Sequence, residues 1–212
     1  MKRFLVSLLL VLLIVSPTRA APLDSVPASG KLSFAIWREG NRIGSHRMTF
    51  RREGTTVTVE VRVDIVVQVA LITLYRYTGL RIETWRDGVL QAFAADTDDD
   101  GKPIKVRARV TPEGLLVEGS RGATAMPPDA QPFTLWSRAV VEGAPVFSME
   151  DGAPLKLQAE DLGLSPPPRG NVPARHFRLT GDLDYELWFD GATLAGVRLK
   201  GRDGSMVEYV VE

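Results

Sequence analysis

Every odd-numbered residue from Val57 to Val69 is a valine or an isoleucine, whereas residues 58, 60, 62 and 64 are threonine, glutamate, arginine and aspartate. Successive side chains of a β-strand point to opposite faces, so this alternation predicts one antiparallel strand over residues 55–69 with a single buried face. A strand of that length spans roughly 45 to 50 Å, and long strands in a twisted sheet curl. The stretch therefore favours a barrel or a half-barrel over a flat sheet.

Turn signals recur along the rest of the chain at regular intervals. Each is an acidic residue followed by glycine, which supplies the positive φ of a tight hairpin. Between them the same alternation returns in residues 104–110 and 183–189. We therefore predict an all-β fold, a single antiparallel meander curved into a barrel or half-barrel, with a two-sheet sandwich as the alternative. The turn pairs are Glu39-Gly40, Glu53-Gly54, Asp87-Gly88, Asp100-Gly101, Glu113-Gly114, Asp151-Gly152, Asp190-Gly191 and Asp203-Gly204.

Two segments interrupt the strand pattern. Residues 134–141 place Leu135 and Ala139 on one side of a helix, so at most one short helix of two turns is expected there. Residues 165–170, Ser-Pro-Pro-Pro-Arg-Gly, are expected to form a stiff surface loop rather than a domain linker, because consecutive prolines favour an extended conformation.

The first twenty residues have the organisation of a secretory signal peptide. Lys2 and Arg3 precede an apolar run over residues 4–15 that is too short to serve as a membrane-spanning helix. Thr18 and Ala20 then supply the small residues that precede a cleavage site. We therefore predict a signal peptide over residues 1–20 and a single β-rich domain over residues 21–212, exported to the periplasm.

Composition excludes several classes of protein. The chain contains no cysteine, which excludes structural disulfides, thiol nucleophiles, cysteine-based zinc sites and a lipid-anchoring cysteine. Acidic and basic residues are equal in number, and three of the basic ones lie in the signal segment, so the remaining domain is slightly acidic. This balance argues against a nucleic-acid partner. No second apolar stretch predicts a membrane span, since residues 65–74 contain Gln68 and Thr73.

Residues 96–101, Asp-Thr-Asp-Asp-Asp-Gly, match the opening of a calcium-binding loop. The twelfth position of such a loop supplies a bidentate glutamate, but here it is Arg107, and the flanking residues alternate like strands. We therefore interpret the stretch as an acidic hairpin turn, with a weak surface calcium site as the alternative. No required metal and no cofactor are expected.

Two histidines are the candidates for a histidine-based metal site or catalytic triad. His46 shares its phase with Met48 and Phe50, on the apolar face of its strand, whereas His176 opposes Phe177. Parity therefore predicts that His46 points inward as a core histidine and that His176 is exposed on the outer face. The two are not expected to act together.

Pairs of acidic residues on one strand share its polar face, as in Glu60/Asp64 and Asp184/Glu186. The paired acids of a glycosidase face each other across a cleft, whereas acids on one face beside arginines are typical of cross-strand ion pairs. Serines 45, 120, 137, 148 and 205 lack a Gly-x-Ser-x-Gly context. The sequence therefore displays no catalytic constellation.

Residues 65–77 are apolar in both phases, unlike the strand that precedes them. A central strand covered on both faces explains this pattern, and we favour that account because apolar runs of this length usually fill cores. The alternative is a flap or barrel wall that faces an apolar ligand or partner, with amphipathic rings as its contacts. The candidate contacts are Tyr75, Trp85, Trp136 and Trp188.

A resemblance to a known family covers essentially all of the domain. It rests on residues 181–190, on the Asp203-Gly204-Ser205 ending and on several upstream segments. In these residues the chain resembles DUF6134, a family of uncharacterised exported bacterial proteins. The resemblance implies a periplasmic β-rich protein and supplies no catalytic residues. The upstream segments are Phe34 with Gly40, Ile43-Gly44 and His46, then Tyr75-Arg76-Tyr77, Glu83-x-Trp85-x-Asp87-Gly88, residues 97–101, Trp136 and residues 174–183.

From these observations we expect a non-catalytic binding or envelope-associated module. The concavity lined by residues 65–77 would hold an apolar small molecule, a lipid or a protein partner. The alternative is a hydrolase that acts on an envelope polymer, with carboxylates such as Glu60 or Asp203 in acid–base roles.

Overall fold

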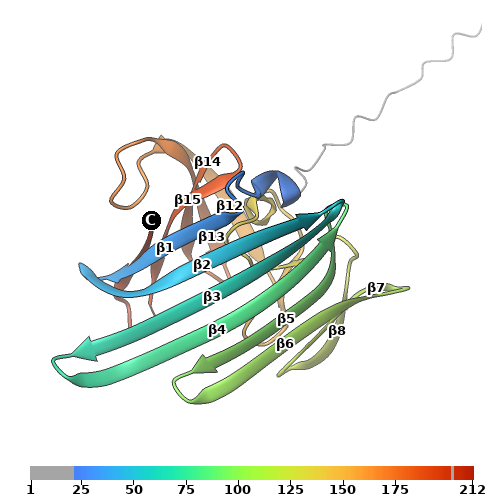
Figure 1. The fold of residues 1–212 in the computed structure, drawn as a ribbon, viewed down its shortest axis with the longest axis horizontal. Helices are drawn as coiled ribbons and strands as arrows, with labels where there is room; N and C mark the ends of the chain where they lie inside the picture. Colours follow the sequence, from blue (N-terminus) through green and yellow to red (C-terminus); the bar gives the residue numbers. More distant parts are fainter. Residues whose placement is uncertain (1–21, 202) are drawn as a thin grey trace, which may run out of the picture.

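The computed structural model describes residues 22–201 and 203–212, and nearly all of its regular structure is β (Figure 1). The predicted signal peptide, residues 1–20, lies outside the described residues. The strands are β1 (Lys31–Arg38), β2 (Asn41–Glu53), β3 (Thr56–Val69), β4 (Ile72–Arg86), β5 (Val89–Asp99), β6 (Lys102–Thr111), β7 (Gly114–Gly119), β8 (Gly122–Met126), β9 (Gln131–Pro132), β10 (Val146–Phe147), β11 (Pro154–Leu155), β12 (Leu157–Ser165), β13 (Ala174–Gly181), β14 (Tyr185–Asp190), β15 (Thr193–Lys200) and β16 (Met206–Val211), with 3₁₀ turns η1 (Pro22–Ser25) and η2 (Arg138–Val141).

One antiparallel sheet of 13 strands dominates the molecule, in the order β12-β13-β14-β15-β16-β1-β2-β3-β4-β5-β6-β7-β8. The last strand pairs with the first, with Ile36 of β1 opposite Tyr209 of β16, so two meanders are joined into one continuous sheet. The sheet curves without closing, because its edge strands β8 and β12 do not pair with each other. This architecture confirms the predicted all-β meander and selects the half-barrel over the sandwich.

The long alternating strand is β3, and its valines form part of the core. Val57, Val59, Val61 and Val63 are all buried, whereas the intervening residues of β3 are half-buried or exposed. Burying one face of a strand fixes its register, because a slip of one residue would expose every one of these valines. The pairing of β3 with β4, for example Val57 opposite Trp85, continues the buried face across the sheet.

The concave face of the sheet is filled by residues 127–155, which connect β8 to β12 and carry the small three-stranded sheet β11-β10-β9. In Figure 1 this segment is the yellow part of the ribbon behind β1–β4. Trp136 is fully buried and makes edge-to-face contacts with Phe50 and Trp85, with ring centroids 5.5 and 5.6 Å apart. Phe147 contacts Phe93 in the same way at 5.4 Å. The core is therefore a curved sheet wrapped around its own connecting segment.

The predicted helix over residues 134–141 shrinks to the single 3₁₀ turn η2. The prediction was wrong for its first half because Ser137 is extended, with φ −88° and ψ 119°. Just before it, the Phe133 amide donates to the Phe147 carbonyl, which ties this part of the segment to β10. Tertiary packing of the segment against the sheet has therefore overridden a weak helical pattern.

The apolar run over residues 65–77 is not one strand, and the favoured account of a covered central strand was wrong. It comprises the end of β3, a turn at Ala70 and Leu71, and the start of β4. Ala70 has a φ of 53°, in the left-handed region that glycine or asparagine normally occupies in a two-residue hairpin turn. The sequence therefore contained no signal for this turn. In contrast, residues 165–170 form the predicted surface loop, which connects β12 to β13.

The packing of Trp136 predicts that a Trp136→Ala variant is destabilised by about 3 to 5 kcal/mol, because a large buried side chain would leave a cavity between the segment and the sheet. Urea denaturation followed by circular dichroism measures the change. The control is Leu71→Ala at the hairpin turn, where the wild-type side chain is 98% exposed and stability should be unchanged. Equal stability of the Trp136→Ala variant and the wild type would show that the segment does not hold the sheet.

Candidate functional site

A group of polar side chains occupies the inner face of the sheet at the end where β3 and β4 extend furthest. We call these five residues the inner polar layer: His46 from β2, Tyr77 and Arg81 from β4, Tyr185 from β14 and Tyr209 from β16. Their positions follow from strand parity, since His46 has the phase of buried Met48 and Arg81 has the phase of buried Trp85. His46 and Arg81 are 2% and 8% exposed, and the three tyrosines are half-buried.

Arg81 is the unusual member of the layer. Its Nη2 donates to the Tyr77 hydroxyl at 3.0 Å, and its buried Nε has no hydrogen-bond partner. Within the described part of the chain, no carboxylate lies within the 4.0 Å of an ion pair with this guanidinium. A buried charge is normally paired, because desolvation without a partner is costly. Arg81 therefore places a positive charge on the inner face that interacts with Glu83 but forms no direct ion pair.

Three other members of the layer, His46, Tyr185 and Tyr209, are neutral at physiological pH. Burial, with a smaller effect from the charge of Arg81, lowers the pKa of His46 to about 3. Both of its ring nitrogens are buried without a hydrogen-bond partner, and its ring packs edge-on to Tyr209 with centroids 5.6 Å apart. Burial raises the pKa of Tyr185 to about 12 and also raises the pKa of Tyr209. The tyrosine hydroxyls consequently stay protonated and can donate hydrogen bonds.

Deeper on the same face, Glu83 links the sheet to the filling segment. Its Oε2 accepts hydrogen bonds from the indole Nε1 of Trp85 at 2.9 Å and of Trp136 at 3.1 Å. Glu83 is completely buried, and burial raises its pKa to about 7 against the opposing effect of these hydrogen bonds. At neutral pH its charge is therefore only partly developed, which limits how well it can balance Arg81.

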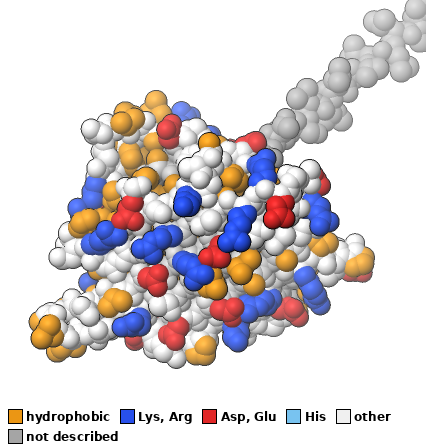
Figure 2. Space-filling model, viewed as in Figure 1, with side chains coloured by type: hydrophobic (Ala, Val, Ile, Leu, Met, Phe, Trp, Pro, Cys, Tyr) orange, Lys and Arg blue, Asp and Glu red, His pale blue; other side chains and the backbone are white. Residues whose placement is uncertain are grey.

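Beyond this layer β3 and β4 continue as a hairpin that pairs with no other strand among the described residues. The pairing of β3 with β2 ends at Ile65, and the pairing of β4 with β5 ends at Tyr77. We call residues 66–75 the apolar ribbon, because they contain no charged residue. Four of their apolar side chains are more than half exposed, and Figure 2 shows them at the lower left end of the molecule. These four are Val69, Leu71, Ile72 and Leu74.

The four candidate contacts from the sequence lie in three separate places. Trp85 and Trp136 meet in the core and share Glu83 as acceptor. Tyr75 is half-buried at the base of the apolar ribbon, where its hydroxyl donates to Asp99 Oδ1 at 2.6 Å. Trp188 is buried on the opposite, outer face. Tyr75 is thus the candidate that lies next to the inner polar layer.

Trp188 belongs to an outer-face cluster on β12–β14. His176 stacks on its ring at 4.1 Å, and Trp188 Nε1 donates to Ser165 Oγ at 2.9 Å. Ser165 Oγ lies 3.1 Å from His176 Nδ1, and His176 Nε2 lies 3.3 Å from Glu186 Oε2. Burial lowers the pKa of His176 despite the opposing effect of Glu186. His176 does point outward as predicted, but this stacking leaves it half-buried rather than exposed.

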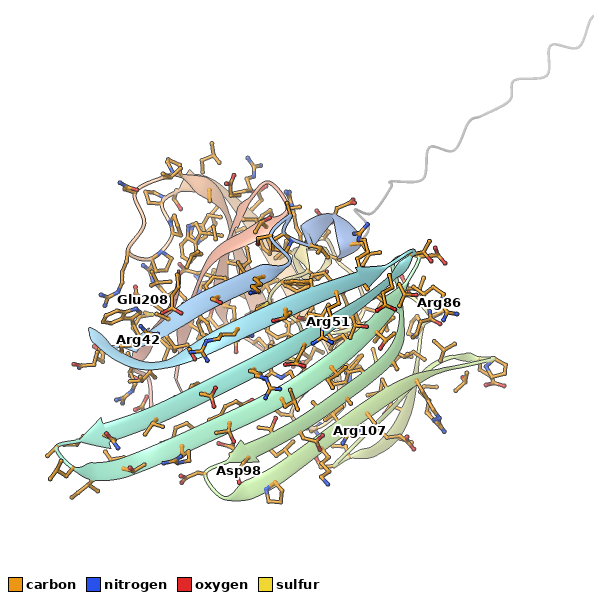
Figure 3. The ribbon with its side chains drawn as sticks, in the orientation of Figure 1. Arg42, Arg51, Arg86, Asp98, Arg107 and Glu208 are labelled. Atoms are coloured by element: carbon orange, nitrogen blue, oxygen red, sulfur yellow. The ribbon has the colours of Figure 1, made fainter. Side chains whose placement is uncertain are left out.

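Elsewhere the outer face carries ion pairs. Arg107, labelled in Figure 3, donates through Nη2 to both carboxylate oxygens of Asp96 at 2.8 and 2.9 Å. Glu60 pairs with Arg62 at 2.8 Å, and Asp203 pairs with Arg38. Exposed pairs of this kind contribute little to stability. A shallow depression of about 380 Å³ lies between β3 and β6 and is bordered by both acids and bases.

The acidic stretch at residues 96–101 forms the β5–β6 hairpin turn, as we interpreted it. Asp98 Oδ1 accepts a hydrogen bond from the Gly101 amide at 2.7 Å, so this carboxylate stabilises the turn. Among residues 22–201 and 203–212, no cluster of three or more histidine, aspartate or glutamate side chains has a metal-binding arrangement. The same residues include no helix that is long and apolar enough to cross a membrane.

Sequence reasoning placed His46 on the inner face correctly but missed Arg81 and the tyrosines of the inner polar layer. A signal was present for Arg81, because Arg81 and Glu83 interrupt the inward phase that leads to Trp85. A charged residue in a buried phase is a marker of function or of internal pairing. No such signal marks Tyr185 and Tyr209. They lie on strands β14 and β16, more than 100 residues after Arg81 in the sequence.

Comparison with known proteins agrees with the resemblance seen in the sequence. The model of the family described as "Domain of unknown function (DUF6134)" matches residues 34–212. The chain belongs to this family. The match includes every residue of the inner polar layer and the apolar ribbon, so both are parts of the DUF6134 domain. No curated protein matches the chain.

Among solved structures, the DUF6134 chain is similar to a beta-barrel-like protein of the domain of unknown function DUF1849 from Brucella abortus. The TM-score is 0.54 at 8% sequence identity, and the alignment covers 86% of this chain and 94% of the other. At that identity the likeness concerns the fold alone. It supports the barrel-like curvature of the sheet.

Glu83 and His46 are expected to affect the pH dependence of stability in opposite directions. The pKa of Glu83 is raised from 4.5 to about 7 in the folded protein, so its contribution to stability is lost as the pH rises through that window. The pKa of His46 is lowered from 6.5 to about 3, so its contribution is lost as the pH falls through that window.

Urea denaturation of Glu83→Gln and His46→Phe variants across this pH range measures both effects. Relative to the wild type, Glu83→Gln should gain stability as the pH rises from 4.5 to 7, and His46→Phe should gain stability as the pH falls below 6.5. The control Asp64→Asn, at an exposed position of β3, should follow the wild type. A pH-independent difference between Glu83→Gln and the wild type would contradict the raised pKa.

Proposed function

We propose that the DUF6134 chain is a non-catalytic binding module for an amphipathic molecule and that it works in the periplasm. The ligand's polar group would lie on the inner polar layer and its apolar part along the apolar ribbon. The signal-peptide pattern of residues 1–20 supports the location. The observation that carries the proposal is that the inner polar layer and the charge-free ribbon are adjacent on β4.

The half-buried state of the tyrosines supports a site that a ligand can reach. Tyr77, Tyr185 and Tyr209 face inward yet keep part of their surface exposed, whereas the inner residues nearer Trp136 are completely buried. The filling segment therefore does not fully cover this end of the inner face. Amphipathic rings and a few convergent polar groups are typical of sites that bind small molecules.

The ribbon supplies a path for an apolar chain. Ile65, Val67 and Tyr75 are half-buried and lead from the inner polar layer toward the exposed side chains near Leu71. From Arg81 to Tyr75, β4 extends about 20 Å at ~3.3 Å per residue. Contiguous exposed apolar residues on a soluble domain usually mark an interaction site, and a two-stranded hairpin alone is marginally stable in water. An apolar chain bound along the ribbon would remove apolar side chains from water and would stabilise the two-stranded hairpin.

The chemistry of the inner polar layer favours binding over catalysis. His46 is neutral far below physiological pH, so it is a poor general base, and the tyrosines hold their protons firmly. Glu83 is a nearby carboxylate with a raised pKa, but it is completely buried: both indoles of the core donate to its Oε2, and its Oε1 is buried without a partner. These groups can hold a ligand in place without transferring a proton to it.

Binding of 11-(dansylamino)undecanoic acid, a fluorescent amphiphile, tests the proposal. We expect enhanced, blue-shifted emission with the wild type and at least a several-fold loss of affinity in the double variant Val69→Glu/Leu71→Glu, since charges on the ribbon oppose an apolar chain. The control Val172→Glu, at an exposed position of the β12–β13 loop, should bind as the wild type does. Absence of binding to the wild type would refute the module.

The outer-face cluster favours a second candidate function, the hydrolase. Ser165, His176 and Glu186 provide a hydroxyl, an imidazole and a carboxylate in sequential contact, as in serine hydrolases, but here the serine contacts Nδ1 and the carboxylate contacts Nε2, the reverse of the usual triad. Ser165 Oγ would attack an acyl carbon and pass its proton to His176 Nδ1, which would return it to the leaving alcohol. Water would then hydrolyse the acyl-serine ester. This candidate ranks second because the indole of buried Trp188 already donates to Ser165 Oγ.

Labelling with a fluorophosphonate, which reacts with activated serines, separates the two candidates. A hydrolase would be labelled at Ser165, and Ser165→Ala would abolish the label. The control Ser205→Ala, which removes a hydroxyl bonded to Asp203 and Arg38, would leave the label unchanged. Because the Trp188 indole already donates a hydrogen bond to Ser165 Oγ, we expect no labelling. A stoichiometric label on Ser165 would support the hydrolase and refute the non-catalytic binding module.

A further inference from the structure

We infer that the amphipathic ligand is an acid, and that Arg81 binds its carboxylate or phosphate group. This inference rests on the proposed function, because it assigns the head group of the molecule bound at the same site. It does not follow from the apolar character of the ribbon, which would suit an uncharged lipid equally well. It follows from the charge of Arg81 and the groups around it.

Burial of the Arg81 charge is costly for the folded protein. The guanidinium is always protonated, and the side chain is 8% exposed without a carboxylate at ion-pair distance among the described residues. A buried charge left in this state is strongly destabilising, and replacing it with an apolar side chain usually stabilises a protein. An anion bound to Arg81 would remove the cost. The structure thus contains half of an ion pair.

The geometry of the free donors matches an oxyanion. Nη2 donates one hydrogen to the Tyr77 hydroxyl and has a second hydrogen, and the neighbouring Nε–H has no partner. Two parallel N–H groups bind two oxygens of a carboxylate or a phosphate in the bidentate manner that arginine favours. Lysine has no equivalent fork of donors.

The rest of the inner polar layer can complete the anion site. The hydroxyls of Tyr185 and Tyr209 make no hydrogen bond to another described residue, and because both stay protonated they can donate. His46 is neutral, with both nitrogens unpartnered, so it can donate one N–H as well. The five residues offer several donors and one positive charge. Two acids act on them from outside the layer: Glu83, which interacts with Arg81, and Glu150, whose charge helps to raise the pKa of Tyr185.

Comparison of an acid with its alcohol analogue tests the inference. The probes are 11-(dansylamino)undecanoic acid and 11-(dansylamino)undecanol, which share the apolar chain and differ in the head group. At pH 7.5 the wild type should bind the acid at least about tenfold more tightly than the alcohol, the difference expected for a charge-assisted hydrogen-bonded pair. Dodecanoate and dodecyl phosphate, used as competitors, then identify which of the two oxyanions is preferred.

Variants of Arg81 locate the source of the preference. Arg81→Met should bind both probes equally, and Arg81→Lys should retain only part of the preference, because lysine keeps the charge without the fork. The matched control is Arg86→Met, at an exposed position on the same strand (Figure 3). Thermal unfolding monitors folding, and Arg81→Met should be at least as stable as the ligand-free wild type.

The outcomes separate the two levels of the proposal. If neither probe binds the wild type, the binding module itself is refuted. If both probes bind with equal affinity, the module stands and the acidic head group is refuted, a result that needs no variant. If Arg86→Met lowers the preference as much as Arg81→Met does, overall charge and not Arg81 selects the acid, and the inference is overturned.

Discussion

The fold depends on one constraint: a curved sheet of 13 strands must be filled from within, and the chain fills it with its own residues 127–155. Trp136 is the centre of that filling, since it packs against Trp85 and Phe50 and donates to Glu83. The contact is both apolar and directional. The hydrogen bond to Glu83 fixes the position of the segment along the sheet, and the apolar packing holds the segment against it. A purely apolar contact would define that position less specifically.

Filling by a segment of limited length divides the inner face into two regions. Around Trp136 the face is packed and apolar apart from Glu83, whereas toward Tyr77 it is polar and partly exposed. Trp85, Glu83, Arg81 and Tyr77 follow one another in the same phase of β4, so a single strand runs from the core to the inner polar layer. Any ligand bound at the layer would thus be held by a strand that the core makes rigid.

Strand parity predicted much of this fold because its physical basis is local. The alternation from Val57 to Val69 identified β3, and the phase of His46 identified its inward direction. The hairpin turn at Ala70 could not be predicted, because alanine there adopts a positive φ without the usual glycine. The inner polar layer as a whole could not be predicted either. The pairing of β16 with β1 brings Tyr209 close to His46, although about 160 residues separate them in the chain.

Two departures from ordinary protein design lie on β4, only a few residues apart. One is a buried arginine without an acidic partner, and the other is an exposed ribbon without charge. Each is unfavourable in isolation, because the first costs desolvation energy and the second exposes apolar surface to water. Separate explanations would require two unrelated partners. A single molecule with an acidic head and an apolar chain would satisfy both, with its head at Arg81 and its chain against the ribbon.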